Sequence, residues 1–314
     1  MDITPFLSSF RNNKDLNFCG DHFAGYSQFI GIESLIQLEN IEKLRIAKYK
    51  VPKDSIKKLL ENTKVSKMFI DYVIYTSIDT VTEDTNDILS SIIISKTIEL
   101  LEYNMACSNV SAESYVQFLN HNNHLKSLYS SSITLISTSG KIENLYITNT
   151  SLNYISLDNY LIQIGIEISL YSLWKCQSNL IHIDILETNT PINQLMSLHP
   201  KCSYIFAYNT KYQYEQHLID LINLNLHHVT KIHLEVTKLP LTAIIESITS
   251  RNQYLQRINI NCEIECNLVC QLVRTNLPTL ISIDVRLKDP RSLNITIYGN
   301  VTSFVYCSIL RQVT

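Results

Sequence analysis

The sequence predicts an α/β fold in the form of a right-handed solenoid, with a parallel concave sheet and helices or turns on the convex side. Two observations lead to this prediction. A string of the form apolar-x-x-apolar-x-apolar recurs about a dozen times, at intervals of roughly 17 to 30 residues. In several copies an apolar pattern at helical spacing follows, about 14 to 16 residues after the string begins. A repeated strand-plus-helix unit is typical of a solenoid, and crossovers between parallel strands are nearly always right-handed.

The strands are expected where the string occurs. In an extended segment the apolar residues at positions 4 and 6 point inward, and positions 3 and 5 point outward. The clearest copy is Ile142, Leu145 and Ile147. Other clear copies begin at Ile41, Val65, Leu161, Leu180, Val229, Leu255, Leu280 and Val301. Weaker copies are Ile98 with Leu100, between which Glu99 is expected to point outward, Leu125 with Leu128, and Cys202 with Ile205 and Ala207.

Helices are expected where apolar residues repeat at i, i+3 and i+4. These segments are 56–60, 115–119, 218–222, 244–248 and 269–273. Pro52 with Asp54 or Ser55 opens the first of them, Ser111 can cap the second, and Pro240 suits the first turn of the fourth. Between Leu125 and Cys202 the strings lie only about 17 to 22 residues apart, so an irregular or single-turn segment is expected there.

This unit resembles the leucine-rich repeat, whose consensus continues to a polar residue at position 9 and an apolar residue at position 11. Five consecutive units carry a hydroxyl at position 9, namely Thr150, Ser169, Thr188, Thr210 and Thr237. A stacked hydroxyl row can bond the backbone of the turn after each strand, the role that the family usually gives to Asn or Cys. The resemblance covers residues 41 to 306 and implies a leucine-rich-repeat-like solenoid. An irregular α/β domain is the alternative.

We expect residues 1–40 to form an N-terminal cap and residues 41–314 to form the solenoid. Terminal units of a solenoid need a cap, and Phe6, Phe10 and Leu35 could cover the open first strand. Proteins of this class often carry an F-box or another recruiting module before the repeats, and that is the alternative for residues 1–40. The chain stops eight residues after Tyr306, so the last unit is expected to cap itself.

Composition limits the classes of function. A formal net charge of −3 is too small to imply a nucleic-acid or membrane partner for the whole chain. There is no basic segment before an apolar stretch at the start, and no window approaches eighteen apolar residues, so we expect a soluble, non-secreted protein with no membrane partner. The eight cysteines are mostly scattered singly, which favours reduced thiols in the cytoplasm or nucleus.

No cofactor, metal ion or small-molecule substrate is expected. The chain has no glycine-rich phosphate loop. Cys262, Cys266 and Cys270 are spaced by four, but zinc would need four ligands at a closer spacing, so these cysteines are interpreted as small core residues. His227 and His228 are interpreted as surface residues, because no nucleophile and acid can be placed beside them.

Outward strand positions supply the candidate partner-binding residues. Tyr and Arg on a concave surface most often anchor binding energy, and four of the aromatic residues are expected to lie around a gap at Gly165. The alternative is that these rings only pack on one another across strands. The set is Tyr129, Tyr146, His182, Asp184, Tyr204, Phe206, His233 and Arg257.

A basic segment supplies candidate electrostatic contacts. Residues 41–67 contain nine Lys or Arg against three acids, whereas residues 68–95 contain five acids and no Lys or Arg. This asymmetry can steer a partner, although a solvated helix face is the simpler interpretation. The candidate residues are Lys43, Arg45, Lys57 and Lys58.

The function expected from these patterns is that of a scaffold, not an enzyme, which binds a protein partner on its concave face. One alternative is a ribosome- or RNA-associated protein that uses the basic N-terminal segment, because phosphate affinity requires only clustered Lys and Arg. Another is a Ran-type GTPase activator, also a leucine-rich-repeat family, in which Arg45 would act on a nucleotide bound in another protein. Arg45 is expected within a strand instead of in the loop after it, which disfavours that alternative.

Overall fold

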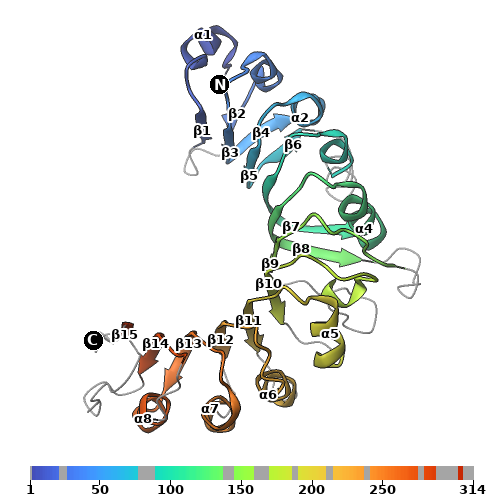
Figure 1. Ribbon diagram of the computed structural model, residues 1–314. Helices are drawn as coiled ribbons and strands as arrows, with labels where there is room; N and C mark the ends of the chain where they lie inside the picture. The colour runs from blue at the N-terminus through green and yellow to red at the C-terminus, as the bar shows by residue number, and fades with distance from the viewer. Residues whose placement is uncertain are drawn as a thin grey trace. The chain divides into compact units, whose positions relative to one another are not determined.

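The computed structural model describes residues 2–20, 27–76, 89–136, 145–158, 170–185, 190–209, 215–236, 241–274, 279–287 and 303–306. The chain divides into two compact units, residues 1–178 and 179–314. Each unit contains a six-stranded sheet in which the strands are parallel and follow one another in chain order (Figure 1). Helices and turns connect the strands, so the α/β class predicted from the recurring string is confirmed.

The first unit is built on a main sheet whose apolar residues run in register. Leu44, Met68 and Leu128 occupy equivalent positions on three of its strands, and all three side chains are buried. A second, three-stranded parallel sheet consists of β2 (Ser27–Gln28), β4 (Tyr49–Pro52) and β6 (Ile74–Thr76). The main sheet consists of β1 (Asp15–Cys19), β3 (Lys43–Ala47), β5 (Lys67–Asp71), β7 (Leu100–Ser111), β8 (Ser127–Ile136) and β9 (Tyr154–Asp158).

The chain turns between these two sheets at residues with left-handed backbone conformation. Lys48 follows β3 with a φ of 64°, and Tyr72 follows β5 with a φ of 50°. Their N–H groups donate to the next strand, Lys48 to the carbonyl of Asp71 at 2.9 Å and Tyr72 to that of Asn104 at 2.8 Å. After β1 the equivalent residue is Gly20, where an added Cβ would lie 2.3 Å from the Lys48 carbonyl oxygen. A side chain is tolerated at the two later turns at a cost of about 1–2 kcal/mol each.

The helices of the first unit begin as their sequences predict. Pro52 precedes α2 (Lys53–Asn62), which buries Ile56, Leu59 and Leu60. The Ser111 hydroxyl accepts a hydrogen bond from the Ser114 N–H and caps α4 (Ala112–His121), as expected for a serine at this position. Shorter segments are η1 (Thr4–Phe6), α1 (Leu7–Phe10), η2 (Ile32–Gln37) and η4 (Leu170–Leu173).

In the second unit one helix follows each of the first four strands. The apolar register is continuous here as well, for example through Ile205, Ile232 and Ile258. Figure 1 shows α6, α7 and α8 on one side of the sheet. The strands are β10 (His182–Ile185), β11 (Tyr204–Asn209), β12 (Lys231–Val236), β13 (Arg257–Ile264), β14 (Ser282–Leu287) and β15 (Ser303–Tyr306), and the helices are α5 (Ile192–Leu198), α6 (Glu215–Asn223), α7 (Leu241–Arg251) and α8 (Cys266–Arg274).

Buried polar residues stand three positions before the first apolar residue of several strings. Asn149 shows their role: its side-chain amide donates to the carbonyls of Leu119 at 2.6 Å and Asn122 at 2.8 Å. Its side-chain oxygen accepts from the N–H groups of Ser151 and Leu152. The full set is Ser95, Asn122, Asn149, His199 and Asn252. The side-chain oxygens of Asn122, Asn149 and Asn252 each accept from the turn into the next strand, and Asn149 also binds one repeat to the one before it.

The hydroxyl row expected after the strands falls largely outside the described residues. Ser169, Thr188, Thr210 and Thr237 are not among them, and Thr150 is exposed. Gly165 and the string that begins at Leu161 also lie outside the described ranges.

The string predicted most clearly is not a strand of the sheet. Ile147 forms an isolated bridge with Trp174, and β9, which begins at Tyr154, is the neighbour of β8. The reason is that Leu152 and Ile155 begin an equally good string whose entry is fixed by Asn149. Tyr146 therefore lies off the sheet, and its carbonyl accepts from the Asn120 side chain at the end of α4.

One further strand assignment differs from the prediction. Leu101, not Leu100, pairs with Met68, so Glu102 and not Glu99 takes the outward position on β7. Residues 1–40, predicted as a cap, contribute β1, which pairs with β3, the first strand of the predicted solenoid. Within the described ranges, no helix is long and apolar enough to span a bilayer.

Replacing Asn149 with Ala should lower the free energy of unfolding by about 2–4 kcal/mol, because several buried backbone groups each lose a partner. Asn153→Ala, at an exposed position nearby, is the matched control and should change it by less than about 0.5 kcal/mol. Urea denaturation followed by circular dichroism measures both. Equal effects from the two substitutions would contradict the role given to Asn149.

Candidate functional site

Strand residues in both units alternate between the core and a solvent-facing side, which we call the open face. On β11, Ile205 and Ala207 are buried, whereas Tyr204 and Phe206 are partly exposed. The alternation follows from the pleat of a strand, which sends successive side chains to opposite sides. The open face is therefore the surface on which the sequence analysis placed its partner-binding residues.

An aromatic cluster, defined as His182, Tyr204, Phe206, His233 and Lys231, lies on the open face of the second unit, where His182 is buried and the other four side chains are partly exposed. His182, Tyr204 and Lys231 are aligned on β10, β11 and β12, and Phe206 is aligned with His233. The His182 ring meets Tyr204 edge-on with 4.4 Å between centroids, and Lys231 Nζ lies 4.1 Å from the centroid of the Tyr204 ring. The rings of Phe206 and His233 lie 4.6 Å apart. Cross-strand pairing thus holds these side chains in one arrangement.

The electrostatics of the aromatic cluster depend on His233. Burial lowers the pKa of His233 below its usual value; nearby Lys231 and His182 add to this lowering, while Glu235 and Asp284 oppose it. The Tyr204 hydroxyl lies 3.5 Å from His233 Nδ1. At neutral pH the His233 ring is therefore uncharged, and it lies in the same cluster as the Lys231 side chain.

The other predicted partner-binding residues are dispersed. Arg257 is aligned with Lys231 and is exposed. The strand position of Asp184 aligns with Phe206, but its side chain lies outside what the structure describes. Tyr129 belongs to the first unit, where it stacks on Tyr154 with 4.6 Å between centroids, and burial raises its pKa. The structure thus brings together the predicted residues of the second unit and leaves Tyr129 and Tyr146 apart from each other.

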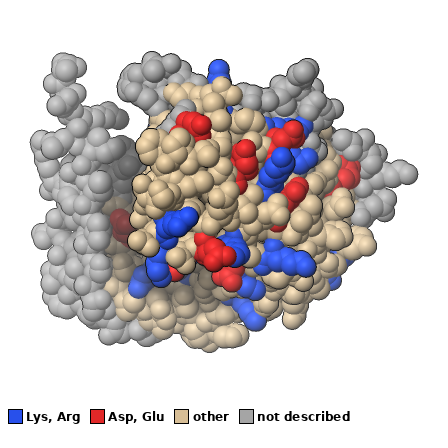
Figure 2. Space-filling model, turned by 90° about the horizontal axis from the view of Figure 1, so that it is seen from above, with Lys and Arg blue, Asp and Glu red and all other residues tan. Residues whose placement is uncertain are grey.

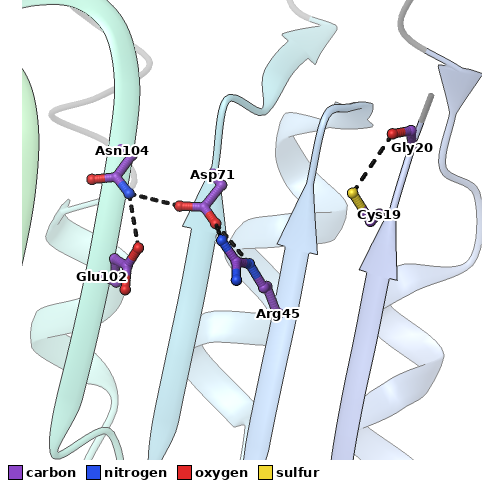
Figure 3. A network of polar contacts seen from close by, with 6 residues as sticks. All are labelled: Cys19, Gly20, Arg45, Asp71, Glu102 and Asn104. Carbon is purple, nitrogen blue, oxygen red and sulfur yellow. Dashed lines mark hydrogen bonds and ion pairs between the residues drawn. The ribbon is translucent and has the colours of Figure 1, made fainter. Parts of the chain in front are cut away.

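The first unit contains a polar hollow that the sequence analysis missed. Arg45 Nε donates to Asp71 Oδ2 at 2.8 Å, and Asn104 donates to Asp71 Oδ1 at 2.7 Å and to Glu102 Oε1 at 3.0 Å (Figure 3). Asp71 is only 3% exposed, so its charge depends on these partners. The hydrogen bond from Arg45 to Asp71 raises the pKa of the guanidinium. The hollow, of about 310 Å³, is lined by Asn17, Cys19, Arg45, Ala47, Lys48, Asp71, Tyr72 and Asn104.

A sequence signal for the hollow exists, although it is weak. Asp71 and Asn104 each stand one residue after the second inward residue of a string, on adjacent strands. A lone polar residue at the end of a strand is ordinary, and only the exact register brings Asp71 between Arg45 and Asn104. The sequence predicts Leu100 instead of Leu101 as an inward residue of β7, so the alignment of Asn104 with Asp71 was not predicted.

Acids lie among the basic residues of the N-terminal segment. Lys14 pairs with Glu42 at 2.7 Å and Lys64 pairs with Glu39 at 2.8 Å, both at the surface. Lys43 Nζ lies 5.1 Å from the centroid of the Phe69 ring. On the face drawn in Figure 2, Lys and Arg are interspersed with Asp and Glu. Acids therefore lie beside some of the cations at the surface of the described N-terminal residues.

The described residues hold no group of three His, Cys, Asp or Glu side chains that could bind a metal ion. Cys266 and Cys270 lie partly exposed on α8, and the Cys262 side chain lies outside the described set.

Comparison with known proteins gives little further guidance. No protein-family description and no curated protein matches the chain. Among solved structures, an internalin from Listeria monocytogenes is similar over 96% of this chain and 83% of that chain, with 15% identity and a TM-score of 0.44. A score of this size supports no inference, so the description of the fold rests on strand order, register and burial.

The lowered pKa of His233 predicts that stability falls as the solution is acidified. The folded state binds its proton less readily than the unfolded state, so its contribution is complete above about pH 6.5 and declines as pH drops through the folded-state pKa. Melting temperatures between pH 7.5 and 5.5 should fall less steeply for His233→Gln than for the unaltered chain. NMR titration of the imidazole should give a pKa below 6.5, and a higher value would contradict this prediction.

Proposed function

We propose that this chain is a non-catalytic scaffold that binds a protein partner. In this proposal the repeats form a right-handed solenoid of leucine-rich-repeat type, and the open face is its concave side. The in-register parallel strands support the repeat architecture, and the single observation that carries the function is the aromatic cluster. The partner-binding residues are His182, Asp184, Tyr204, Phe206, His233 and Arg257.

The aromatic cluster has the properties of a binding hot spot. Tyr204 and Phe206 are half-buried, so each keeps apolar area available to a partner while its neighbours hold its position. A ring fixed before binding loses little conformational freedom on association, which favours affinity. Tyrosine and arginine are also enriched among residues that dominate binding energy. The contacts between rings and the docking role are thus compatible, because the same packing that orders the cluster leaves one side of it open.

The charges around the cluster indicate the kind of partner surface. Lys231 lies over one side of the Tyr204 ring, and exposed Arg257 lies on the next strand. Asp284 is aligned with Asn259 on β14, two strands beyond His233. A partner segment with an apolar or aromatic side chain for Phe206 and an acid near Lys231 and Arg257 would match this arrangement. Charge complementarity of this kind acts mainly on specificity and association rate.

The two alternative functions receive less support. A GTPase activator needs an arginine that can reach a nucleotide in its partner, but Arg45 Nε and Nη2 both donate to Asp71. An RNA contact through the basic segment rests on Lys57 and Lys58 of α2, which are partly and fully exposed. Salt dependence of binding separates this alternative from protein docking.

We also propose a cytoplasmic or nuclear location. Among the described cysteines, Cys19, Cys176 and Cys270 form no disulfide, as expected in a reducing compartment.

Affinity purification from the native cell, followed by a binding assay with the captured protein, tests the function. Tyr204→Ala and Phe206→Ala should each weaken binding by about 1–3 kcal/mol, because each removes an anchor from the open face. Tyr254→Ala is the matched control, since Tyr254 is 38% exposed and lies in the turn before β13. It should leave the affinity unchanged.

Stability measurements on the same variants separate docking from packing. Truncating a buried neighbour, Ile205→Ala, should cost about 2–5 kcal/mol of folding stability, and the two open-face variants should cost clearly less. Unchanged binding with a core-like loss of stability would place Tyr204 and Phe206 in a purely structural role. Loss of binding only on reversing the charges of Lys57 and Lys58, with steep salt dependence, would favour RNA.

A further inference from the structure

The polar hollow of the first unit has the features of a preorganised receptor. Asn104 on β7 holds Asp71 on β5, and Asp71 in turn holds the guanidinium of Arg45 on β3 (Figure 3). The side chain of Asp71 is 5% exposed, whereas that of Arg45 is 44% exposed. The buried carboxylate thus fixes an arginine that still faces solvent, which is how a supporting residue orients a binding group.

Donors around the hollow exceed acceptors. Both oxygens of Asp71 already accept hydrogen bonds, from Arg45 and Asn104. The Arg45 guanidinium has five N–H donors, and only Nε and Nη2 are directed to Asp71. Lys48 lines the same hollow, and its ammonium has no acidic partner among the residues that the structure describes. A ligand in this hollow must therefore accept hydrogen bonds.

Backbone conformation gives a second, independent observation. The hollow is bordered by Lys48 and Tyr72, both in the left-handed region, where glycine would be the unstrained choice. Backbone strain of this kind clusters at binding sites. A lysine at this turn adds a cationic residue to the lining that a glycine could not supply.

Charge and size indicate the chemical class of the ligand. Arg45 and Lys48 against Asp71 leave one net positive charge in the lining, and Glu102, which accepts a hydrogen bond from Asn104 just outside the lining, acts on Arg45 with an opposing charge. That net positive charge matches a carboxylate better than a phosphate group, which carries about −1.5 to −2 at neutral pH. A volume of about 310 Å³ is at the lower end for ligand sites, so the hollow suits a small group and not a large molecule.

We propose that this hollow is a carboxylate-binding site, with Arg45 and Lys48 as the binding cations and Asp71 and Asn104 as positioning residues. The carboxylate belongs either to a small free acid or to a polypeptide, as a glutamate side chain or a chain terminus. The site does not depend on the aromatic cluster of the second unit, so the two proposals can fail separately.

NMR titration of the ¹⁵N-labelled full chain tests the proposal, with the backbone N–H signals of Lys48 and Tyr72 as reporters. The small-acid probe is propionate, with propionamide as its uncharged control. The peptide probes are acetyl-glutamate amide and acetyl-Gly-Gly with a free terminus, each with its amide counterpart as control. We expect saturable shifts with the carboxylates at millimolar concentration, roughly the affinity that a few charge-assisted hydrogen bonds supply. The tighter of the two probe classes identifies the source of the carboxylate.

Variants then assign the shifts to the hollow. Arg45→Gln and Lys48→Gln should each weaken binding about tenfold or more, because each removes a charged donor. Lys58→Gln, an exposed lysine on α2, and Tyr204→Ala should leave it unchanged. Lys48→Gln lies at a partly exposed turn, so it provides the test even if Arg45→Gln disturbs folding around Asp71.

Three results would overturn the assignment. The first is the absence of saturable shifts with every carboxylate probe. The second is equal binding of the amide controls, or tighter binding of inorganic phosphate. The third is a loss of affinity in Lys58→Gln equal to that in Lys48→Gln, which would indicate general attraction to a basic surface instead of a defined site.

Discussion

In-register pairing of parallel strands is the constraint on which the rest of this structure depends. The buried row through Leu44 and Met68, and its counterpart through Ile205 and Ile232, fixes which side chain of each strand meets its neighbour. Because side chains alternate along a strand, the same register also determines the composition of the open face. The contact of Lys231 with Tyr204 and that of Arg45 with Asp71 both follow from this alignment. A slip of one residue would bury these polar groups and expose the core.

Each unit uses its open face differently. The second unit places rings side by side, so its surface offers apolar area with a cation at one edge. The first unit places acids, amides and cations side by side, and they satisfy one another around a hollow. A repeat architecture permits this division because residues on the open face contribute little to the core, so their chemistry can change while the buried row is retained.

The strength of the apolar pattern decided how much of this could be predicted from the sequence. Strands such as β12 and β13 follow strings in which both inward residues are strongly apolar, and their register was predicted correctly. At β7 the second inward residue is Tyr103, a weaker signal, and the register was misjudged. Near β9 two equally good strings follow one another, beginning at Ile142 and Leu152. The second forms the strand, because the buried side chain of Asn149 fixes the turn into it. The hollow could not be predicted, because Asp71 and Asn104 acquire meaning only as neighbours in space.

The contacts of Asn149 affect how the first unit unfolds. Its amide reaches back to Leu119 and Asn122, and its own carbonyl accepts a hydrogen bond from the Trp174 indole further along the chain. Each such bond couples a repeat only to its neighbours, as in a one-dimensional stack. Opening of the structure should therefore spread stepwise from one repeat to the next, and amides near Asn149 should exchange with solvent together. The hydrogen bonds that Asn149 makes to neighbouring repeats thus set the length of chain over which unfolding is cooperative.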